Sequence, residues 1–561
     1  MSFNKLKSWA KINLSLNVIN RLPNNYHKIE SLIAFTQLSD EIKIKKIDEK
    51  KHKILFLGKF SKGINKNNTV AKLLKLLEEK KLLKKKFEIK ITKNIPQKSG
   101  MGGGSMNAAT LLKYLVKKKF VKINSKKMQD LAYKIGRGFG AYLINNSRKT
   151  AAISGDVRPS TDELLKALEL GLLDSGVNVI NLGKLPTPLN YFSMHTDKIS
   201  VDASIQITGS HNPSEYNGFK ITYDKKPFFG KDIQYLYDII NNQEFVDGKG
   251  SSNSYNIIED YCDMIYSKIK IKNKIRVAMD CGNAAGCLVA PELYRNLNLD
   301  LCELYCDVDG KFPNHHPDPT VDSNLVDLQN FVIKNNCDLG VAFDGDADRI
   351  VAVDEKGRII RSDILIAILL PYILSKGDPI VYDVKCSKAL EDVILKLGGH
   401  PVMWKTGHSL IKNKMKETKA KLGGEMSGHI FFADDYFGYD DALYVGLRLI
   451  EILSSNELKL SQLLDEIPVY YSTPELRLEC DSDDHKVEVM DEVFKYFSSK
   501  YDYSDIDGIR LNFDCGWGLI RCSNTQPVIV CRTEADSEEM LLEYKNMLLD
   551  KLVSLGLTEN E

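Results

Sequence analysis

The sequence predicts a multidomain α/β protein with parallel or mixed sheets, and three observations support this fold class. From about residue 150 onward, short Val- and Ile-rich runs alternate with amphipathic stretches of helical period, as is typical of βα units. The length of 561 residues leaves room for roughly three to five domains. Polar segments at 247–254 and 472–474 are candidate joints between them. The clearest strand candidates are residues 177–182, 275–279, 339–343 and 379–383.

The composition excludes several classes of protein. Hydrophobic residues make up 43% of the chain and charged residues 27%, as in a globular protein with several cores. The eleven cysteines contain no C-x-x-C pair, so neither a disulfide framework nor a zinc site is indicated, and a reducing cytoplasm is expected. The longest uncharged apolar run, 364–375, contains Pro371 and is too short to span a membrane, so it predicts a buried helix.

The net charge of +2 hides two segments of opposite charge. Residues 1–130 carry a net charge of +22, and residues 131–561 carry a net charge of −20. A basic segment can bind nucleic acid or a membrane, but Leu and Val recur at helical spacing among these lysines, as in residues 70–77. We therefore interpret the basic part as a folded domain with a lysine-rich solvated face. Neither nucleic acid nor a membrane is expected as a partner.

A glycine-rich loop in the basic part has the pattern of a phosphate site. It follows a strand-like run at 87–92, opens a helix and reads PQKSGMGGGSMNAATLL over residues 96–112. Glycines let backbone N–H groups surround an anion, and the dipole of the following helix adds to the attraction. The alternative is an ordinary flexible turn. The position between strand and helix favours phosphate.

Together with segments 11–16 and 26–31, this loop makes residues 5–136 resemble the N-terminal part of the GHMP kinases, most closely the 4-diphosphocytidyl-2-C-methyl-erythritol kinases. The resemblance implies a partial α+β fold in which Lys11 assists phosphoryl transfer. It also implies that Tyr26 and His27 face the substrate, and that ATP phosphates are held by Gly100, Gly102, Gly103, Gly104 and Ser105. The family's next motif supplies an aspartate base, whereas residues 137–140 read RGFG. Loss of a general base costs about 10²–10⁴ in rate, so we expect a vestigial kinase segment, with ATP a ligand only if that segment is functional.

Four short motifs in the remaining chain carry the chemistry. Residues 207–213 (ITGSHNP) place a serine hydroxyl beside an imidazole in a tight turn, and residues 343–349 (FDGDADR) place three carboxylates at alternate positions. Residues 424–429 (GEMSGH) offer a carboxylate, a hydroxyl and an imidazole. Residues 521–527 (RCSNTQP) offer a guanidinium and short polar side chains suited to a phosphate. Residues 156–160 (DVRPS) could also bind phosphate, but a structural turn is the favoured interpretation.

The acidic motif has two interpretations. Alternating Asp344, Asp346 and Asp348, with Glu355 at the twelfth position, has the ligand spacing of an EF-hand. That interpretation fails because Arg349 occupies the place of the required glycine and the flanking runs are strand-like rather than helical. We therefore predict a Mg²⁺ site at the end of a strand, used for phosphoryl chemistry.

All four motifs in this order make the chain from about residue 132 to the C-terminus resemble the α-D-phosphohexomutases, most closely their phosphomannomutase/phosphoglucomutase branch. The resemblance implies three similar α/β domains and a smaller C-terminal α+β domain around a cleft. It also implies interconversion of hexose 1-phosphate and hexose 6-phosphate through a phosphoserine and a hexose 1,6-bisphosphate. With the kinase-like segment, the expected domains are 1–127, 128–250, 251–365, 366–470 and 471–561.

The resemblance also assigns roles residue by residue. The implied catalytic residues are Ser210, His211, Lys220, Arg349 and His429. The implied Mg²⁺ ligands are Ser210, as its phosphate, with Asp344, Asp346 and Asp348. The implied substrate-binding residues are Lys385, His408, Glu425, Ser427, Arg521, Ser523, Asn524 and Thr525. Met426 stands where the glucosamine-phosphate branch usually has Gln, which favours mannose or glucose.

The resemblance is incomplete on its N-terminal side. The mutases' first strand and their Tyr-Asp-Ile-Arg-Gly-like loop are missing, and the kinase-like part runs directly into the first mutase helix around residues 128–136. A missing charged hydrogen-bond partner costs about 1.5–3 kcal/mol, and a missing strand leaves a sheet edge unpaired. The expected function is a phosphohexomutase joined to a vestigial kinase half, through either a natural fusion or an error of gene assembly. The alternatives are a catalytically silent sugar-phosphate-binding chimera and the kinase itself, and the oligomeric state stays open.

Overall fold

The chain packs as two units, Met1–Lys127 and Met128–Glu561. The structure is a computed structural model. The residues that it describes are 3–13, 17–21, 27–30, 33–49, 51–62, 64, 68–79, 83, 85–95, 107, 108, 110–112, 114, 115, 118, 120, 126–480, 482–523 and 528–557.

The first unit is a small α+β fold. Its four-stranded sheet has the order β1-β4-β6-β5, in which β5 and β6 are parallel and the other pairs antiparallel. The strands are β1 (Asn4–Asn13), β4 (Ile33–Ile47), β5 (Lys53–Leu57) and β6 (Lys86–Thr92), with a separate hairpin of β2 (Asn17–Arg21) and β3 (His27–Glu30). Helix α1 (Thr69–Glu79) buries Val70, Leu74 and Leu77 in the core shared with the sheet. The helical spacing predicted for residues 70–77 is therefore confirmed.

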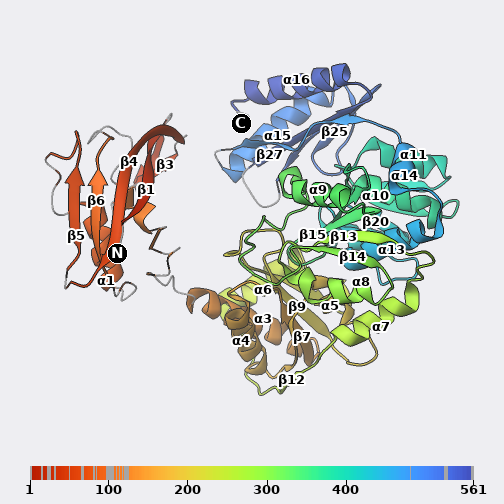
Figure 1. Ribbon diagram of the computed structural model, residues 1–561, viewed down its shortest axis with the longest axis horizontal. Helices are drawn as coiled ribbons and strands as arrows, with labels where there is room; N and C mark the ends of the chain where they lie inside the picture. The colour runs from red at the N-terminus through yellow and green to blue at the C-terminus, as the bar shows by residue number, and fades with distance from the viewer. Residues whose placement is uncertain are drawn as a thin grey trace. The chain divides into compact units, whose positions relative to one another are not determined.

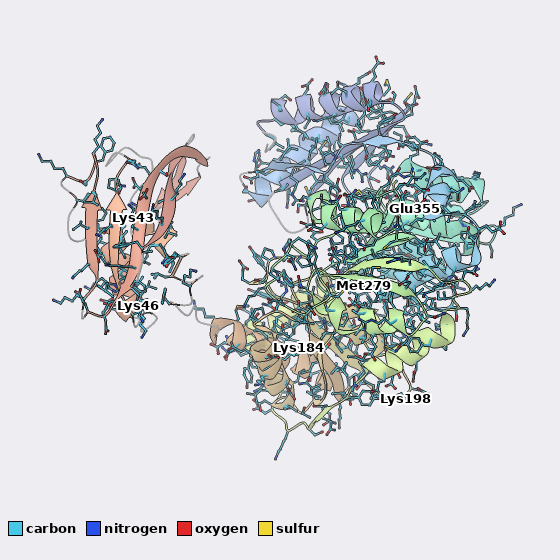
Figure 2. The ribbon with its side chains drawn as sticks, viewed as in Figure 1. Lys43, Lys46, Lys184, Lys198, Met279 and Glu355 are labelled. Carbon is cyan, nitrogen blue, oxygen red and sulfur yellow. The ribbon has the colours of Figure 1, made fainter. Side chains whose placement is uncertain are left out.

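Strand β4 explains how so many lysines fit into a folded unit. Ile42 and Ile44 are fully buried, and Lys43 between them points away from the core and lies 3.1 Å from Glu41 as an ion pair. Figure 2 shows Lys43 and Lys46 on this strand. Alternation of apolar and charged side chains is the pattern of a sheet with one buried and one solvated face.

The buried carboxylate of Asp40 accepts hydrogen bonds from residues on either side of the glycine-rich segment. Asp40 accepts a hydrogen bond from the backbone N–H of Asn94 at 2.7 Å, just before residues 96–106, and one from Asn107 Nδ2 at 2.9 Å, just after them. The Lys93 ammonium also donates to Asp40. Asn94 and Asn107 are thereby held close to the same carboxylate.

The second unit contains four sheets, and domains I to IV are the parts built on them. The domain I sheet has the order β11-β10-β9-β7-β8-β12, in which β7, β8, β9 and β12 run parallel and β10 reverses. Its strands are β7 (Thr150–Gly155), β8 (Asn178–Lys184), β9 (Ala203–Thr208), β10 (Gly218–Tyr223), β11 (Lys226–Pro227) and β12 (Ser252–Ser254). Its helices are α3 (Lys126–Asn145), α4 (Thr161–Leu173), α5 (Thr187–Phe192) and α6 (Lys231–Asn242).

Domain II repeats the mixed arrangement on a smaller scale. Its sheet order is β14-β13-β15-β16-β17, with β13, β14 and β15 parallel and β16 antiparallel to β15. The elements are α7 (Ile258–Lys268), β13 (Arg276–Asp280), η1 (Ala285–Leu288), α8 (Ala290–Arg295), β14 (Asp300–Leu304), η2 (Asp322–Asn324), α9 (Val326–Lys334), β15 (Leu339–Phe343), β16 (Ile350–Asp354) and β17 (Ile359–Ile360). Met279 on β13 lies in the core, as Figure 2 shows.

Domain III has a four-stranded sheet in the order β19-β18-β20-β21, parallel except for β21. Its strands are β18 (Pro379–Asp383), β19 (His400–Trp404), β20 (Leu422–Gly424) and β21 (Ile430–Phe432). Its helices are α10 (Ser362–Leu369), η3 (Leu370–Tyr372), α11 (Lys388–Lys396), α12 (His408–Thr418), α13 (Ala442–Ser455) and α14 (Leu460–Asp465). One continuous core joins domains I, II and III.

Domain IV is an antiparallel sheet covered on one face by two helices, α15 and α16 (Figure 1). Its strand order is β22-β27-β26-β25-β24, with β23 also paired to β27. The elements are β22 (Tyr471–Ser472), β23 (Leu476–Glu479), α15 (Asp483–Phe497), β24 (Asp502–Ser504), β25 (Ile509–Phe513), β26 (Gly516–Cys522), β27 (Val528–Ala535) and α16 (Glu538–Ser554). The predicted three α/β domains and one α+β domain are thus observed.

The four predicted strands are all present, as β8, β13, β15 and β18. The buried helix predicted over 364–375 is only partly right, because α10 ends at Leu369 and a 3-10 turn, η3, follows. Pro371 has no N–H to donate and its ring clashes with the preceding turn, which ends the helix. In the ranges described above, no helix is both long and apolar enough to cross a bilayer.

His195, just after α5, packs between domains I and III. Its ring centroid lies 4.7 Å from that of Phe437 and 5.6 Å from that of Tyr439. Burial, and secondly the charge of Lys225, lower the pKa of His195 to about 4 from its ordinary value near 6.5. His195 is therefore neutral in the folded protein at pH 5, whereas it is charged in the unfolded chain.

This shift predicts how stability depends on pH. Below pH 6.5 the unfolded chain binds a proton at His195 that the folded protein does not bind, so the free energy of unfolding falls as the pH falls toward 4. The His195→Phe variant keeps a ring there and has no such proton. We expect its stability advantage over the wild type to grow by about 2 kcal/mol between pH 7.5 and pH 5. Urea unfolding at the two pH values measures this difference, and an unchanged difference would contradict it.

Candidate active site

Ser210 lies in the loop that connects β9 to β10. Its φ of +47° is in the left-handed region, which a serine adopts when surrounding contacts enforce it. Ser210 Oγ donates a hydrogen bond to Asp344 Oδ2 at 2.9 Å and lies 3.3 Å from His211 Nδ1. Burial, and secondly Arg349, lower the pKa of His211 to about 4. The hydroxyl of domain I therefore faces a carboxylate of domain II and a neutral imidazole.

Arg158, from the loop after β7, holds the serine loop in this conformation. Its side chain is fully buried, and its Nε donates to Asp156 Oδ2 at 2.8 Å. Its Nη2 donates to the backbone carbonyls of Ser210 at 2.6 Å and Asn212 at 2.7 Å, and its Nη1 donates to that of Pro213. One planar guanidinium thus binds three backbone carbonyls of the same loop. The structural interpretation of residues 156–160 fits these contacts.

The acidic loop connects the antiparallel strands β15 and β16. An EF-hand loop would connect two helices instead. Oxygen atoms of Asp344, Asp346 and Asp348 lie within 4.8 Å of one another, and all three side chains are fully buried. Gly345 permits the close approach of this loop to the serine loop, because a Cβ at position 345 would lie 2.3 Å from the Ser210 carbonyl oxygen.

Two cations balance part of this negative charge. Lys220, on β10, donates from Nζ to Asp346 Oδ2 at 2.7 Å and also to Asp348. Arg349 Nε lies 3.8 Å from Asp344 Oδ2. Burial alone would lower the pKa of Lys220, but Asp346 and Asp348 outweigh it and hold this pKa well above its ordinary value. Burial and the two neighbouring aspartates raise the pKa of Asp344 well above its ordinary value.

A divalent cation fits the acidic loop. Asp346 Oδ1 is buried and has no hydrogen-bond partner among the residues described, and such an oxygen is unfavourable unless something binds it. Three carboxylates offer the hard oxygen ligands that Mg²⁺ prefers. Burial, and secondly the repulsion among these carboxylates, raises the pKa of Asp344, and positive charge between them relieves that repulsion.

The loop between β20 and β21 holds Glu425 and Ser427 in place. Glu425 Oε1 accepts from the backbone N–H of Gly407 at 2.6 Å, and Oε2 accepts from Ser427 Oγ at 2.9 Å. Burial raises the pKa of Glu425, but His429 and Lys385 outweigh it and hold this pKa below its ordinary value. Glu425 is therefore an anionic acceptor suited to sugar hydroxyls.

Asp440 joins two histidines of domain III. His429 Nδ1 lies 2.9 Å and His408 Nδ1 3.4 Å from Asp440 Oδ2, and the two imidazole rings stack with centroids 5.2 Å apart. Burial, and secondly Lys412, lower the pKa of His408. His429 Nδ1 also lies 3.6 Å from Asp348 Oδ1, which brings the loop between β20 and β21 against the acidic loop.

Domain IV contributes a guanidinium that is already paired. Arg521 Nε donates to Asp507 Oδ2 at 3.0 Å, and Asp507 also accepts from the backbone N–H of Thr406 in domain III at 3.0 Å. Lys385 Nζ lies 2.9 Å from Glu475 Oε1 as an ion pair. The backbone N–H of Ser523 donates to Val528, a contact within domain IV.

The structure describes most, but not all, of the predicted site residues. Ser210, His211, Lys220, Arg349, His429 and the three aspartates are joined by the contacts above, and so are His408, Glu425 and Ser427 with His429. Asn524 and Thr525 lie outside the described residues. So do Tyr26, Gly100, Gly102, Gly103, Gly104 and Ser105 of the kinase-like segment. Lys11 and His27 lie on β1 and β3, and their side chains are also outside the description.

Three residues that shape the site were not predicted as functional. The sequence indicated a role for Arg158, because residues 156–160 (DVRPS) were interpreted as a structural turn. The sequence did not indicate a role for Asp440 or Asp507, since single aspartates are common in loops and the partners of these two lie elsewhere in the sequence.

Comparison with known proteins agrees with this fold and site. Family models described as phosphoglucomutase/phosphomannomutase alpha/beta/alpha domains I, II and III match residues 121–247, 259–357 and 361–471, and the C-terminal domain model matches 475–551. A further model, the GHMP kinases N terminal domain, matches residues 68–143. The mutase domain I model and the kinase model therefore both match residues 121–143, most of which form helix α3.

Individual relatives cover the same part of the chain. A phosphomannomutase/phosphoglucomutase of Pseudomonas aeruginosa is 40% identical over 426 residues, which are 75% of this chain and 91% of that protein. A phosphoglucomutase of Neisseria gonorrhoeae is 40% identical over 423 residues, covering 74% and 91%. The crystal structure of a phosphoglucomutase/phosphomannomutase family protein from Burkholderia thailandensis superimposes with a TM-score of 0.73 at 38% identity, covering 77% and 95%.

The three α/β domains, the α+β domain and the serine facing an acidic loop define a multidomain enzyme of phosphoryl transfer. The relatives make the assignment specific. The chain belongs to the phosphoglucomutase/phosphomannomutase family.

Proposed function

We propose that this protein interconverts hexose 1-phosphate and hexose 6-phosphate, with Ser210 as the phosphoryl carrier. The observation that carries the proposal is the 2.9 Å hydrogen bond from Ser210 Oγ to Asp344 Oδ2. It brings a serine of the domain I loop between β9 and β10 to the three-carboxylate loop of domain II. Relatives named phosphomannomutase and phosphoglucomutase support the same activity.

The proposed reaction moves one phosphoryl group at a time. A free hexose hydroxyl attacks the phosphorus of phospho-Ser210, the bond from phosphorus to Ser210 Oγ breaks, and a hexose 1,6-bisphosphate results. The bisphosphate turns over in the cleft, its other phosphoryl group returns to Ser210 Oγ, and the isomeric monophosphate leaves. Neutral His211, 3.3 Å from Ser210 Oγ, is placed to accept the serine proton in the return step.

Residues around Ser210 would stabilise the negative charge of the phosphoryl group during its transfer. Lys220 and Arg349 are the cations placed to face the phosphoryl oxygens as charge spreads over them. Asp344, Asp346 and Asp348, with the phosphate on Ser210, would hold Mg²⁺, which when bound supplies further neutralisation of that charge. His429, held by Asp440, is the candidate to exchange the proton of the sugar hydroxyl.

Sugar recognition is assigned to domains III and IV. Glu425 and Ser427 would accept and donate hydrogen bonds at the sugar hydroxyls, beside Lys385 and His408. The loop of Arg521, Ser523, Asn524 and Thr525 would hold the phosphate that is not reacting. Arg521 would then exchange part of its contact with Asp507 for the phosphate. Mannose and glucose are the proposed sugars, and the cytoplasm is the proposed location, since all eleven cysteines are free thiols.

A coupled assay tests the proposal. The full chain is supplied with glucose 1-phosphate or mannose 1-phosphate, Mg²⁺ and a trace of glucose 1,6-bisphosphate, and hexose 6-phosphate formation is followed. Turnover of either sugar supports the mutase. Absence of turnover with the sugar phosphate still bound would instead identify a silent sugar-phosphate-binding protein.

Metal removal gives a second, independent expectation. Chelation by EDTA should lower kcat by about 10²–10³-fold, because the buried carboxylates then repel both each other and the phosphoryl group. Readdition of Mg²⁺ should restore the rate, whereas the same ionic strength of NaCl should not. Turnover that is insensitive to chelation would contradict the assignment of the acidic loop.

A further inference from the structure

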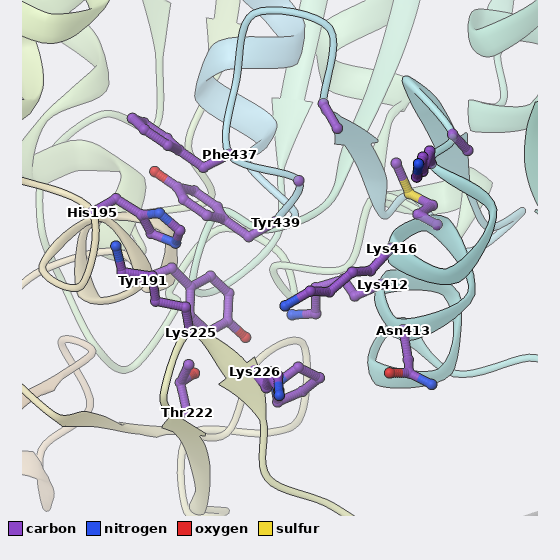
Figure 3. A pocket seen from close by; sticks show the side chains of 16 residues that line it. Tyr191, His195, Thr222, Lys225, Lys226, Lys412, Asn413, Lys416, Phe437 and Tyr439 are labelled. Carbon is purple, nitrogen blue, oxygen red and sulfur yellow. The ribbon is translucent and has the colours of Figure 1, made fainter. Parts of the chain in front are cut away.

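A cavity lies between domains I and III, and none of the predicted catalytic or substrate-binding residues lines it. Its volume is about 440 Å³, and its walls come from α5 and the segment after it, the β10–β11 turn, α12 and the loop after β21. Volumes of this size are usual for sites that bind small organic molecules. Figure 3 shows side chains from these separate segments converging on one space.

Four lysines that line the cavity form no ion pair among the residues that the structure describes. Lys225 and Lys226 enter from the β10–β11 turn, and Lys416 and Lys419 enter from α12 and its C-terminal end. In the part of the chain that the structure describes, no carboxylate lies within 4.0 Å of any of these four ammonium groups, and no acidic residue lines the cavity. Ammonium groups gathered around one space repel one another, and an anion placed between them relieves that repulsion.

One wall of the same cavity is aromatic. Phe437 lines the cavity and is 36% exposed. Tyr439 stacks on Phe437 with nearly parallel rings, 5.9 Å between centroids, and the His195 ring packs against Phe437 at 4.7 Å between centroids. The rings support one another, so Phe437 is a preformed surface for a planar group.

We propose that this cavity binds a nucleoside phosphate, with the phosphates among the lysines of α12 and the β10–β11 turn and the base on Phe437. The pairing of unneutralised ammonium groups with an exposed aromatic ring points to this class rather than to a simple anion. A hexose phosphate offers charge but no planar π-surface. A nucleoside offers the surface but no charge.

A fifth lysine connects this cavity with the candidate active site. Lys412 lines the cavity, lies over the Tyr191 ring at 4.3 Å and donates to Asp440 Oδ1 at 2.8 Å. The other oxygen of Asp440 lies 2.9 Å from His429 Nδ1. Phosphate bound in the cavity would compete with Asp440 for the Lys412 ammonium. A change in mutase rate on binding would follow, and this consequence, unlike the binding itself, rests on the proposed function.

Calorimetry on the full chain tests the binding, with ADP, pyrophosphate and adenosine as probes. We expect ADP to bind with a dissociation constant below about 1 mM, pyrophosphate to bind about tenfold more weakly because it lacks a stacking base, and adenosine to bind more weakly still. Raising the salt concentration should weaken ADP binding. Failure of ADP to bind the wild type would overturn the proposal.

Two variants and a matched control assign the binding to this cavity. The K416E/K419E double variant should weaken ADP and pyrophosphate at least tenfold, while F437L should weaken ADP alone, by about tenfold. The control K376E/K396E reverses two exposed lysines of domain III outside the cavity and should leave both affinities unchanged. Equal losses in the control and the cavity variant, or no loss in either cavity variant, would overturn the site. An unchanged urea midpoint of K416E/K419E confirms that it is folded, independently of mutase activity.

Discussion

Ser210→Ala should lower turnover about 10⁴-fold or more and abolish phosphate incorporation into the protein. The reason is geometric: Ser210 Oγ is the hydroxyl that contacts Asp344, and alanine leaves no atom to carry the phosphoryl group between the two halves of the reaction. The coupled assay measures the rate, and intact mass measures phosphate after incubation with glucose 1,6-bisphosphate. Binding of the sugar phosphate should survive, since its assigned contacts lie on other loops.

Ser214→Ala is the matched control for this variant. Ser214 belongs to the same loop, but its Oγ contacts Glu215 at 3.2 Å and points to no carboxylate of the acidic loop. We expect its rate and its phosphate incorporation to stay close to those of the wild type. A Ser210→Ala protein that retains a tenth of the wild-type rate, or still takes up phosphate, would rule out Ser210 as the carrier.

Buried parallel strands were the part of the fold that the sequence predicted best. Residues 339–343 and 379–383 form β15 and β18 with the bounds expected, because a strand covered on both faces is apolar without interruption. The same reasoning overextended the helix at 364–375, since apolarity does not distinguish a helix from the turn that Pro371 imposes.

For the candidate site, too, the sequence predicted contacts within one loop but not contacts between loops. Spacing within one loop placed Asp344, Asp346 and Asp348 together, because a single turn between two strands brings alternate residues to one point. Contacts between loops could not be predicted this way. The hydrogen bond from Ser210 to Asp344 spans 134 residues, and it depends on how domains I and II share a core.

The kinase-like and mutase-like parts of the sequence meet within helix α3. The net charge changes sign near residue 130, and α3 runs from Lys126 to Asn145 without a break. Both the kinase and the mutase family models match residues 121–143. An amphipathic helix needs only its apolar period to serve either fold, so this is a place where two unrelated sequences can be joined with the helix kept intact. In the described part of residues 1–127, the strands pair as the sheet β1-β4-β6-β5 and the hairpin of β2 and β3.

Arg158→Met should both destabilise the protein and slow catalysis. Methionine matches much of the volume but leaves Asp156 buried without its cation, and removal of one partner from a buried ion pair costs about 3–5 kcal/mol. The carbonyls of Ser210, Asn212 and Pro213 lose their donors as well. Because a displacement of about 1 Å at a reacting atom can cost 10²-fold, we expect kcat to fall about 100-fold with little change in KM.

The split between kcat and KM separates a positioning role from a purely structural one. If Arg158 only stabilised the fold, the folded fraction at low temperature would turn over at the wild-type rate, and only the unfolding midpoint would fall. Arg158→Lys restores the charge beside Asp156, but one ammonium cannot reach three carbonyls in a fixed plane. It should recover part of the stability and little of kcat. The control, Arg148→Met, removes a partly exposed arginine of domain I that lies 3.3 Å from Asp202, and loss of such a surface pair should cost about 0–1 kcal/mol and leave kcat unchanged.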